Sequence, residues 1–582
     1  MMYRHLLINK NNQNKRKKYI KIMNKINYIE KYINTKVDIA QTIPFGFVSS
    51  TNNDPYVYGK RNIEKNLPFD SNSIYRMASQ SKFMGTVAFL KLIDRGIVTW
   101  ETPLKDYLPE FSVQKMRVID PYVPNKFEKI SFNPLFTQEN SHTIIVTTEN
   151  NLKEGDYVSL EWSNGSLDVS KRELPTVNGI NGFEMFNVFQ IFNVTSTTFA
   201  IKTTSLATIT GTCGGMVKIK QVEQGVHRSI FLGPSKVYIQ PTVTTYYYKL
   251  QPLKRELTIL DVLTHGLGWS YYTYAMLYMS FGYSKDITKN NIQAGIWNEL
   301  GLPVGIPLSC YKCGIRQWAR IASTIPLLYQ PGEDWSYGPQ LALLGALIEE
   351  IDHRPVEQYM REELWDPLGM KDTGFFINDQ KQQERLCELY VNMPKIVLKF
   401  MGEDFVYQFE PIQEAHKCLY DGPKSLCLID SGMYTTVNDY LKFLNLFITP
   451  NKTFNTPDKS KILSTKMILI ISSFETDFDV TNLGSVSSYS SFGTQENNRC
   501  DGILKNIRWG LGVGKIIGKN IITWAGVLGT RFLIDFDENV AYNVGTNVIG
   551  PPAGSFDVEL IELCHKPMLD IDYRVILADL LF

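Results

Sequence analysis

Hydrophobic and polar residues follow two different periods along the 582-residue chain. In residues 83–93 the apolar side chains Phe83, Val87 and Leu90 recur at helical spacing, and Gly96 follows as a stop signal. Residues 44–60 instead predict two strands joined by a turn at Asn52-Asn53-Asp54-Pro55. The chain therefore has a strand pair and a buried helix within its first hundred residues.

The pattern changes between about residues 113 and 250, where apolar and polar residues alternate. Turn pairs such as Asn178-Gly179 and Gly214-Gly215 separate the runs, which are 143–148, 157–162, 189–194, 198–203 and 216–219. We expect a compact all-β insert here, a small sandwich or barrel. Its role is open: the sequence fits substrate gating, binding of an unknown partner, or an insertion that was acquired without a function of its own.

Helical patterns return after the insert, and strand-like runs follow near the end of the chain. The expected helices are 257–263, 315–328, 341–351 and 355–364, with further helices at 24–34 and 575–582. The expected strands are 509–513, 515–517, 521–527, 531–535 and 540–546, after an exposed loop at 472–501. This predicts a basic N-terminal extension and helix (1–40), a main domain in two parts (41–112 and 251–549), the β-rich insert (113–250) and a C-terminal tail (550–582).

The charge balance argues against nucleic acid as a partner. The net charge is +1, from 60 basic and 59 acidic residues. Residues 1–37 are an exception, because ten Lys or Arg face the single acid Glu30. A frayed basic tail is the favoured interpretation, and a nucleic-acid or targeting role is the alternative. The sequence shows no membrane span and no secretory signal, so we expect a cytoplasmic protein.

The cysteine and histidine content predicts neither a metal nor another cofactor. The eight cysteines are scattered and do not resemble a disulfide framework. Cys310 and Cys313 form an isolated CxxC without a second ligand pair, so incidental thiols are favoured over zinc. The seven histidines are not clustered. His265 follows a helix, and without a G-x-S-x-G elbow it is interpreted as a structural residue.

A serine–lysine pair is the strongest chemical signal. Ser79 precedes the predicted helix 83–93, and Lys82 lies three residues later, where the two side chains can meet. A serine hydroxyl needs an activating partner, and a buried lysine is a plausible base. The pattern alone is weak, because Ser112–Lys115 and Ser309–Lys312 repeat it. Only Ser79 stands between a strand-like run and a long apolar helix.

Several blocks in a fixed order resemble the beta-lactamase-related serine hydrolases, which include class C beta-lactamases, DD-peptidases and class C-like esterases. The blocks are 75–82 (YRMASQSK), 92–96 (LIDRG), 103–109 (PLKDYLP), 257–265 (LTILDVLTH), 331–338 (PGEDWSYG), 365–373 (WDPLGMKDT) and 431–436 (SGMYTT). The resemblance covers 44–112 and 251–548. It implies an α+β fold, with an antiparallel sheet from residues near 44–60 and 505–548 flanked by helices, a mainly helical lobe, and the all-β module inserted.

The resemblance also implies roles for individual residues. Tyr337 would be the second member of the proton-handling pair with Lys82, and a packed aromatic residue is the alternative. The backbone N–H groups of Ser79 and Val527 would form an oxyanion hole. Gly526 would allow the backbone to approach the ligand closely.

Two departures from the pattern narrow the expected substrate. Pro339 stands where lactam-acting members usually carry Asn, and Trp524-Ala525-Gly526 stands in place of Lys-Thr-Gly. A substrate carboxylate therefore loses its lysine partner, and Trp524 becomes a candidate wall of the acyl pocket or a packed core residue. We expect an esterase or amidase acting on a small ester, amide or lactam through an acyl-enzyme on Ser79. Beta-lactamase or DD-peptidase activity, or a catalytically weak binding protein, are the alternatives.

Overall fold

The computed structural model describes residues 45–50, 52–124, 127–162, 176–180, 182–234, 241–271, 287–302, 312–377, 379–394, 407–411, 425–448, 462–478 and 507–549. The chain divides into two units. The first unit is formed by Met1–Val98, Gly305–Gly314 and Asp352–Phe582, and the second by Thr99–Val304 and Ile315–Ile351.

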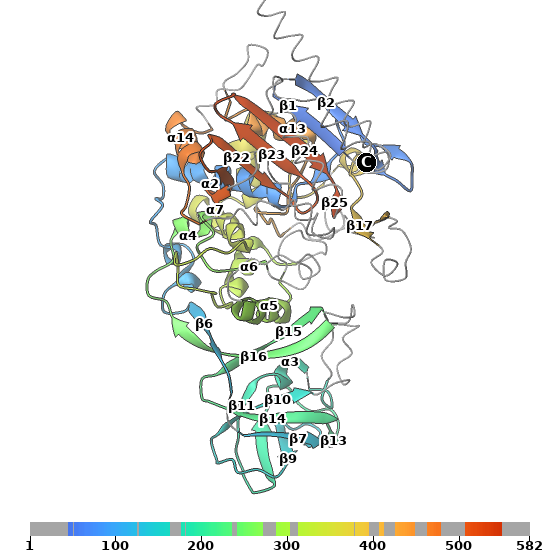
Figure 1. Cartoon of the computed structure of the whole chain (residues 1–582), viewed down its shortest axis with the longest axis vertical. Coiled ribbons are helices and arrows are strands. Elements are labelled where there is room, and N and C mark those ends of the chain that lie inside the picture. The colour runs from blue at the N-terminus through green and yellow to red at the C-terminus, as the bar shows by residue number, and fades with distance from the viewer. Residues whose placement is uncertain are drawn as a thin grey trace, which may run out of the picture. The chain divides into compact units, whose positions relative to one another are not determined.

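The first unit is built on a seven-stranded antiparallel sheet that joins residues 45–58 to strands from residues 507–546 (Figure 1). Its order is β2 (Asn52–Tyr58), β1 (Phe45–Ser49), β24 (Val540–Thr546), β23 (Arg531–Asp535), β22 (Ile521–Ala525), β21 (Gly514–Ile516) and β20 (Ile507–Trp509). The strand-like runs at 531–535 and 540–546 thus predicted two strands with their correct bounds. In the described part of the chain, β1 pairs with β24 from Phe45↔Thr546 to Ser49↔Tyr542.

Two details of this sheet differ from the sequence prediction. The expected turn at 52–55 is wrong, because β2 begins at Asn52 and the chain reverses at Ser50. Pro55 is tolerated because β2 lies at the sheet edge, opposite a register shift between Phe47 and Ser49. The expected strand 509–513 is also wrong: β20 ends at Trp509, and Gly512 with a φ of +65° turns the chain.

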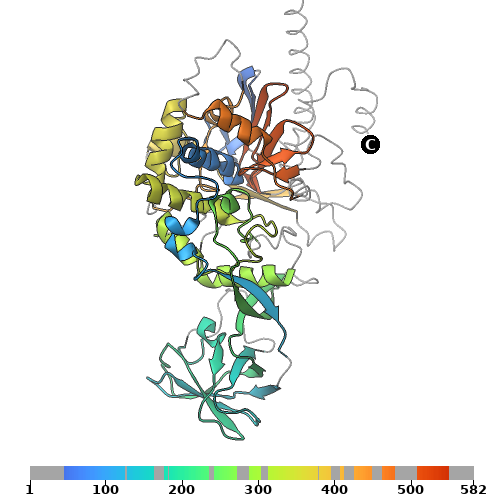
Figure 2. The ribbon, with the colours of Figure 1, turned by 90° about the vertical axis from the view of Figure 1, so that its left-hand side faces the viewer.

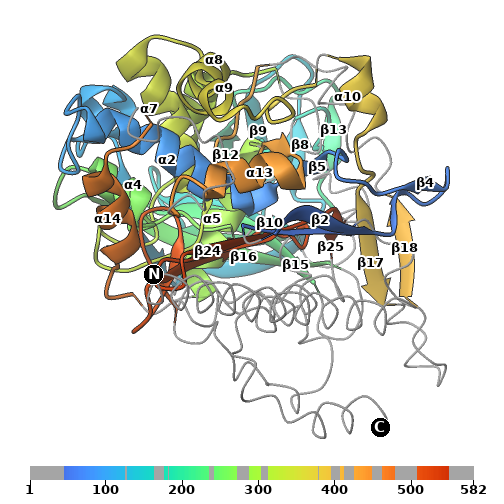
Figure 3. The same ribbon diagram turned by 90° about the horizontal axis from the view of Figure 1, so that it is seen from above.

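Two helices pack on one face of the sheet (Figure 3). The buried helix α2 (Ser81–Asp94) carries Phe83, whose ring stacks on Phe532 of β23 at 5.1 Å. Helix α13 (Val437–Leu444) packs on β24 and β1. The chain leaves α2 through Gly96, where a φ of +70° favours glycine. Apolar periodicity therefore predicted both the existence and the approximate ends of α2.

Shorter elements complete the first unit. Its helical elements also include the 3₁₀ turn η1 (Ala78–Gln80), α8 (Val356–Met360), the π-helical turn η6 (Arg361–Trp365), α9 (Asp366–Leu368), α10 (Gln380–Glu384) and α14 (Thr465–Ser473). Its small sheets are β3 (Lys60–Asn62) with β4 (Leu67–Pro68), β5 (Tyr75–Arg76) with β19 (Tyr434–Thr435), and β17 (Tyr390–Pro394) with β18 (Tyr407–Pro411) and β25 (Val548–Ile549).

The second unit contains a helical part around a cluster of tryptophans. Its helical elements are η2 (Leu104–Asp106), η3 (Pro109–Phe111), α3 (Gly182–Met185), α4 (Ile259–Leu263), α5 (Ile287–Leu300), α6 (Ile315–Ala322), η5 (Pro339–Ala342) and α7 (Leu343–Asp352). Trp269, Trp297 and Trp318 pack with ring centroids 5.5 to 6.3 Å apart. The expected helix 315–328 is too long, because Pro326 disfavours helical backbone before it and α6 ends at Ala322.

The stretch expected to be an all-β insert forms a sandwich. One sheet has the order β11 (Val188–Gln190), β10 (Tyr157–Trp162), β14 (Met216–Val222) and β7 (Glu128–Phe132), and the other has β12 (Thr198–Lys202), β9 (Thr143–Thr147), β8 (Leu135–Thr137) and β13 (Gly211–Cys213). One apolar core is shared by both sheets; it includes Ile144, Val146, Val158, Leu160 and Ile219. Asn178 and Gly179 both have positive φ, as the turn signal predicted.

A third sheet connects this sandwich to the helices of the second unit. It consists of β15 (His227–Pro234), β16 (Pro241–Pro252) and β6 (Arg117–Tyr122). Helix α5 packs closely on β15. Gly295 makes this approach possible, since a Cβ at that position would lie only 2.5 Å from the Ile230 carbonyl oxygen. Tyr247 of β16 reaches the sandwich, where its hydroxyl is 2.7 Å from Ser159 Oγ. Figure 2 shows β6 in blue and β15 and β16 in green.

Some expectations fall outside the described residues: the helices at 24–34 and 575–582, most of the loop at 472–501, and Cys310. The proposed domain bounds stay a prediction. Among the residues described, helices of the length and apolarity needed to cross a membrane are absent. The same residues contain no cluster of three or more His, Cys, Asp or Glu suited to a metal ion.

Candidate active site

Ser79 lies in the turn that leads from a strand into a buried helix. Strand β5 pairs with β19, then η1 carries Ser79, and α2 begins two residues later. Ala78 has a φ of +51°, a conformation that costs energy for any residue with a side chain. Ser79 is half-buried, whereas Ala78 and Gln80 on either side are buried. The serine hydroxyl is thus presented from a strained and well-packed turn.

Lys82 meets Ser79 as the spacing predicted. Its Nζ is 3.3 Å from Ser79 Oγ, and the side chain is buried at the start of α2. Because residues three apart share a helix face, this contact follows from the local geometry.

A third residue joins the pair, and sequence reasoning missed it. Lys82 Nζ donates to both the backbone oxygen and the carboxylate Oδ2 of Asp430, each at 3.2 Å. The Lys82 and Asp430 side chains are 0% and 1% exposed, so this is a buried ion pair. Ser431 Oγ donates to the other carboxylate oxygen at 3.0 Å. The one available signal was an acid directly before the 431–436 block.

A glycine allows the Asp430 segment to approach α2. Gly85 lies one turn after Lys82, and a Cβ there would come within 2.5 Å of Ile429 Cγ1 and 2.6 Å of the Ile429 oxygen. Any larger residue would push Ile429 away from the helix. Gly85 therefore sets the distance at which Asp430 reaches Lys82.

Buried polar contacts anchor the Ser79 turn to the sheet. Gln80 Nε2 donates to Asn543 Oδ1 of β24 at 2.7 Å, and Tyr440 of α13 donates to the Gln80 oxygen at 3.1 Å. Asn543 Nδ2 in turn donates to the Tyr75 hydroxyl. Burial raises the pKa of both Tyr75 and Tyr440 above the ordinary value, so both phenols stay neutral near pH 7.

The turn after β22 lies against the Ser79 segment. Thr530 Oγ1 donates to the Met77 oxygen at 2.8 Å, and the Gly526 N–H donates to the Thr530 oxygen at 2.7 Å. A Cβ at Gly526 would lie 2.5 Å from the Met77 oxygen and 3.1 Å from Ala78 Cβ. Gly526 is thus brought next to the residues that precede Ser79.

The two other residues predicted on this segment are also placed. Trp524 is 3% exposed, and its ring meets Trp509 edge-on at 4.7 Å. Val527 packs with Ala78 and Leu528. The acyl-pocket role of Trp524 and the oxyanion role of the Val527 N–H stay predictions.

Tyr337 and Pro339 belong to the second unit, so the pairing of Tyr337 with Lys82 and the substrate-binding position of Pro339 also stay predictions. The Tyr337 ring is buried and packs on His265 at 5.2 Å and on Tyr271 at 5.3 Å. Pro339 is the first residue of η5. His265 is buried with a φ of +59°, and its backbone oxygen accepts from Tyr329.

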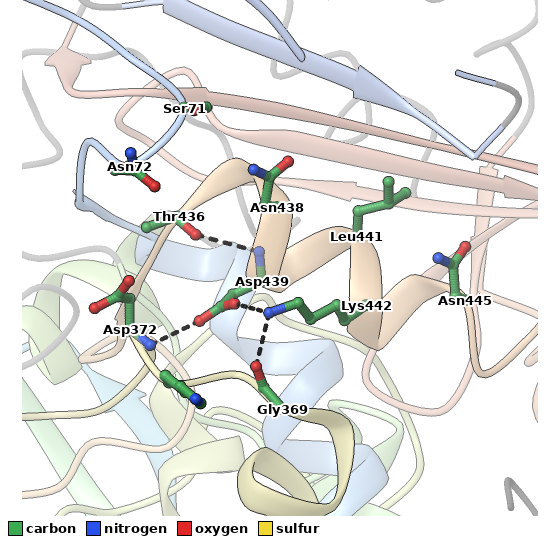
Figure 4. A pocket seen from close by; sticks show the side chains of 11 residues that line it. Ser71, Asn72, Gly369, Asp372, Thr436, Asn438, Asp439, Leu441, Lys442 and Asn445 are labelled. Atoms are coloured by element: carbon green, nitrogen blue, oxygen red, sulfur yellow. Dashed lines mark hydrogen bonds and ion pairs between the residues drawn. The ribbon is translucent and has the colours of Figure 1, made fainter. Parts of the chain in front are cut away.

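One pocket of about 480 Å³ lies elsewhere in the first unit (Figure 4). It is lined by Ser71, Asn72, Gly369, Lys371, Asp372, Thr436, Asn438, Asp439, Leu441, Lys442 and Asn445, none of which is a predicted site residue. Asp439 accepts from the Asp372 N–H at 2.8 Å and from Lys442 at 2.6 Å, and Lys442 also donates to the Gly369 oxygen. These contacts join α13 to the 369–372 turn.

Comparison with known proteins places the chain in one family. The Beta-lactamase family model matches residues 40–120 and 214–562, leaving out most of the sandwich. Protein Rv1367c of Mycobacterium tuberculosis is 25% identical over 223 residues, which are 38% of this chain and 45% of that protein. Esterase EstB of Burkholderia gladioli is 34% identical over 80 residues, 14% of this chain and 20% of that protein. The chain thus matches less than half the length of these relatives.

Solved structures confirm the predicted fold. EstCE1, described as a hydrolase with promiscuous acyltransferase activity, aligns over 94% of this chain and 100% of its own with a TM-score of 0.52 and 12% identity. Unliganded simvastatin synthase (LovD) from Aspergillus terreus, as its selenomethionyl derivative, aligns over 93% and 97% with a TM-score of 0.52 and 14% identity. The α+β fold expected from the ordered blocks is therefore correct, and the family match spans more than half of the 582 residues. The chain belongs to the Beta-lactamase family.

Proposed function

We propose that this protein is a serine hydrolase that acts on small esters or amides through an acyl-enzyme on Ser79. The observation that carries the proposal is the 3.3 Å contact between Ser79 Oγ and Lys82 Nζ at the start of α2. A serine at a helix start beside a buried lysine has a nearby cationic or basic group and a positive backbone potential.

The reaction would proceed by two acyl transfers. Ser79 Oγ bonds to the substrate carbonyl carbon, its proton passes to the Lys82–Tyr337 pair, and the carbonyl electrons move onto oxygen. The N–H groups of Ser79 and Val527 would stabilise that oxyanion. Collapse expels the alcohol or amine, which takes a proton back from the pair. Water, or another acceptor, then releases the acyl group from Ser79.

The altered motif on strand β22 favours ester substrates over lactams. Trp524 occupies the position at which lactam-acting relatives carry a lysine, and a substrate carboxylate would have no cationic partner from that residue. Relatives named Lovastatin esterase, from Penicillium rubens, and Esterase EstB support an ester substrate, although each aligns with only 12–14% of this chain.

Labelling with a fluorophosphonate and with a fluorescent penicillin tests the proposal. We expect the fluorophosphonate to label the wild type and the Ser112→Ala control equally, and Ser79→Ala to lose the label. Tyr337→Phe should label at least a hundredfold more slowly if it belongs to the proton-handling pair. Penicillin labelling of Ser79 would indicate a lactam-recognising enzyme instead. Folded wild type that takes up neither probe would contradict the proposal and favour a binding protein.

A further inference from the structure

The Ser79 turn has a backbone shape that local preference does not favour. Ala78 has a φ of +51°, and a residue with a side chain keeps such a conformation only where its surroundings hold it. On the preceding side, the Met77 N–H donates to the Met433 oxygen at 2.9 Å, and the Met77 oxygen accepts from Thr530. The side that follows Ser79 needs a support of its own.

Gln80, directly after Ser79, is held through both its backbone and its side chain. Its backbone oxygen accepts from the Tyr440 hydroxyl at 3.1 Å, and its Nε2 donates to Asn543 Oδ1 at 2.7 Å. Gln80 and Asn543 are both 0% exposed, so water does not compete for this contact. The two residues are 463 positions apart, and their hydrogen bond joins the turn to β24, an inner strand of the seven-stranded sheet.

The direction of this hydrogen bond is set by another partner of Asn543. Its Nδ2 lies 3.2 Å from the backbone oxygen of Val437, and a carbonyl oxygen can only accept. Asn543 therefore turns its NH₂ group toward Val437 and its Oδ1 toward Gln80, which has to donate through Nε2. The same Nδ2 also donates to the Tyr75 hydroxyl at 3.2 Å, in the strand that precedes the turn. The orientation of the Gln80 side chain is thus fixed from the sheet.

Folding stability alone does not account for an amide at Gln80. Its Oε1 is buried and accepts no hydrogen bond from the described residues, and a buried polar atom without a partner lowers stability. A methionine of similar length would avoid that cost. We propose that Asn543 is a positioning residue that holds Gln80, and with it the Oγ and N–H of Ser79, in the geometry needed for acyl transfer. This inference rests on the proposed function and adds a residue to its site.

The effect of losing this contact is expected on the reaction rate and not on substrate affinity. Ser79 supplies both the nucleophilic Oγ and one of the proposed oxyanion N–H groups, so a shift of the turn misplaces two reacting groups at once. Misplacement by about 1 Å can slow a reaction by about a hundredfold. Asn543 is fully buried and offers no surface to a substrate, so its replacement leaves substrate contacts in place.

Asn543→Leu tests the assignment, with 4-nitrophenyl acetate for kcat and KM, the fluorophosphonate for the labelling rate of Ser79, and urea unfolding for stability. We expect kcat and the labelling rate to fall by about tenfold or more, while KM changes by less than about twofold. Combining Asn543→Leu with Gln80→Met replaces both polar partners by apolar side chains and should regain part of the stability lost in the single variant. The rate should stay low in this double variant, because the hydrogen bond is still missing.

Asn291→Leu is the matched control. Asn291 of α5 is buried, its Nδ2 donates to the Tyr246 hydroxyl at 2.8 Å, and its Oδ1 likewise accepts no hydrogen bond from the described residues. The change thus removes a comparable buried amide from the second unit. It should lower the stability and leave the labelling rate of Ser79 at the wild-type value.

A wild-type labelling rate in folded Asn543→Leu would overturn the inference. So would a double variant whose rate recovers together with its stability, since the contact would then serve folding alone. If Asn543→Leu does not fold, Gln80→Met, which removes the same hydrogen bond from its other end, decides by the same criteria. A folded wild type without label on Ser79 would refute the proposed function itself, whereas equal labelling of wild type and Asn543→Leu refutes only the role of Asn543.

Discussion

Two Ser-x-x-Lys sequences in this chain have the same spacing and opposite surroundings. Lys82 is buried, contacts Ser79 Oγ and pairs with Asp430. Lys115 is exposed, and its backbone N–H donates to the Ser112 oxygen at 3.0 Å. Ser112 ends the η3 turn in extended backbone, so no long helix begins there. The third copy, Ser309–Lys312, has its serine outside the described residues.

The difference shows what the motif needs besides its spacing. Ser79 stands at the start of a buried 14-residue helix, and Gly85 and Gly526 admit neighbouring backbone on two sides of it. The Ser112 segment begins no such helix, and the lysine beside it faces solvent. Reactivity is therefore expected where burial brings a counter-charge and excludes water.

The largest effect on the rate of acylation is expected when Lys82 is replaced. Lys82→Ala should slow acylation of Ser79 by about a hundredfold or more, because the activating group at 3.3 Å is lost. The matched change Lys115→Ala should leave the rate unchanged. Fluorophosphonate labelling rates measure both, with circular dichroism to check folding. Near-normal labelling of Lys82→Ala would remove this lysine from the mechanism.

A smaller effect is expected at the glycine beside Met77. Gly526→Ala would place a methyl group 2.5 Å from the Met77 oxygen, so the turn must move at a cost of about 1–3 kcal/mol in the free energy of unfolding. Gly314→Ala is the control, because its nearest contact is 3.8 Å from the Ser425 oxygen. Urea unfolding of the two variants gives the comparison. Equal midpoints would show that the approach of β22 to the Ser79 turn is looser than the contacts indicate.

The smallest effect is expected from replacing Glu363, which pairs with Lys91 near the C-terminal end of α2 and contributes to the free energy of unfolding. Burial opposes ionisation of Glu363, but hydrogen bonds from Arg95, Lys91 and Arg354 outweigh it and lower its pKa to about 2. The folded-state pKa is depressed, so this stabilisation is present above the ordinary pKa of 4.5 and is lost as pH falls toward 2.

Glu363→Gln should therefore lower the free energy of unfolding by about 1–2 kcal/mol at pH 7 and by less near pH 2. Glu357→Gln, which removes the more exposed 3.5 Å pair with Arg361, is the control and should have a smaller effect. Tryptophan fluorescence during urea unfolding at both pH values checks the prediction. A loss that does not depend on pH would contradict the charge argument.

Much of the fold could be read from local patterns. Strands β23 and β24 have the bounds of the predicted strand-like runs, and α2 extends the predicted helix by only two residues at its start and one at its end. The errors lie where a neighbour overrides local preference. Pro55 sits in a strand because β2 is at a sheet edge, and Gly512 turns a chain whose apolar residues indicated a strand.

In the sequence by itself, the ordered motif blocks determined the family and the α+β class through their resemblance to known hydrolases. The three-residue spacing determined the contact of Ser79 with Lys82, because spacing along a helix is a local property. Only the tertiary structure decided that Asp430, 348 residues from Lys82, meets the Lys82 Nζ. That contact depends on how closely Ile429 approaches Gly85, which is a property of packing. Spacing along a helix fixes which side chains can meet, whereas packing decides which distant carboxylate joins them.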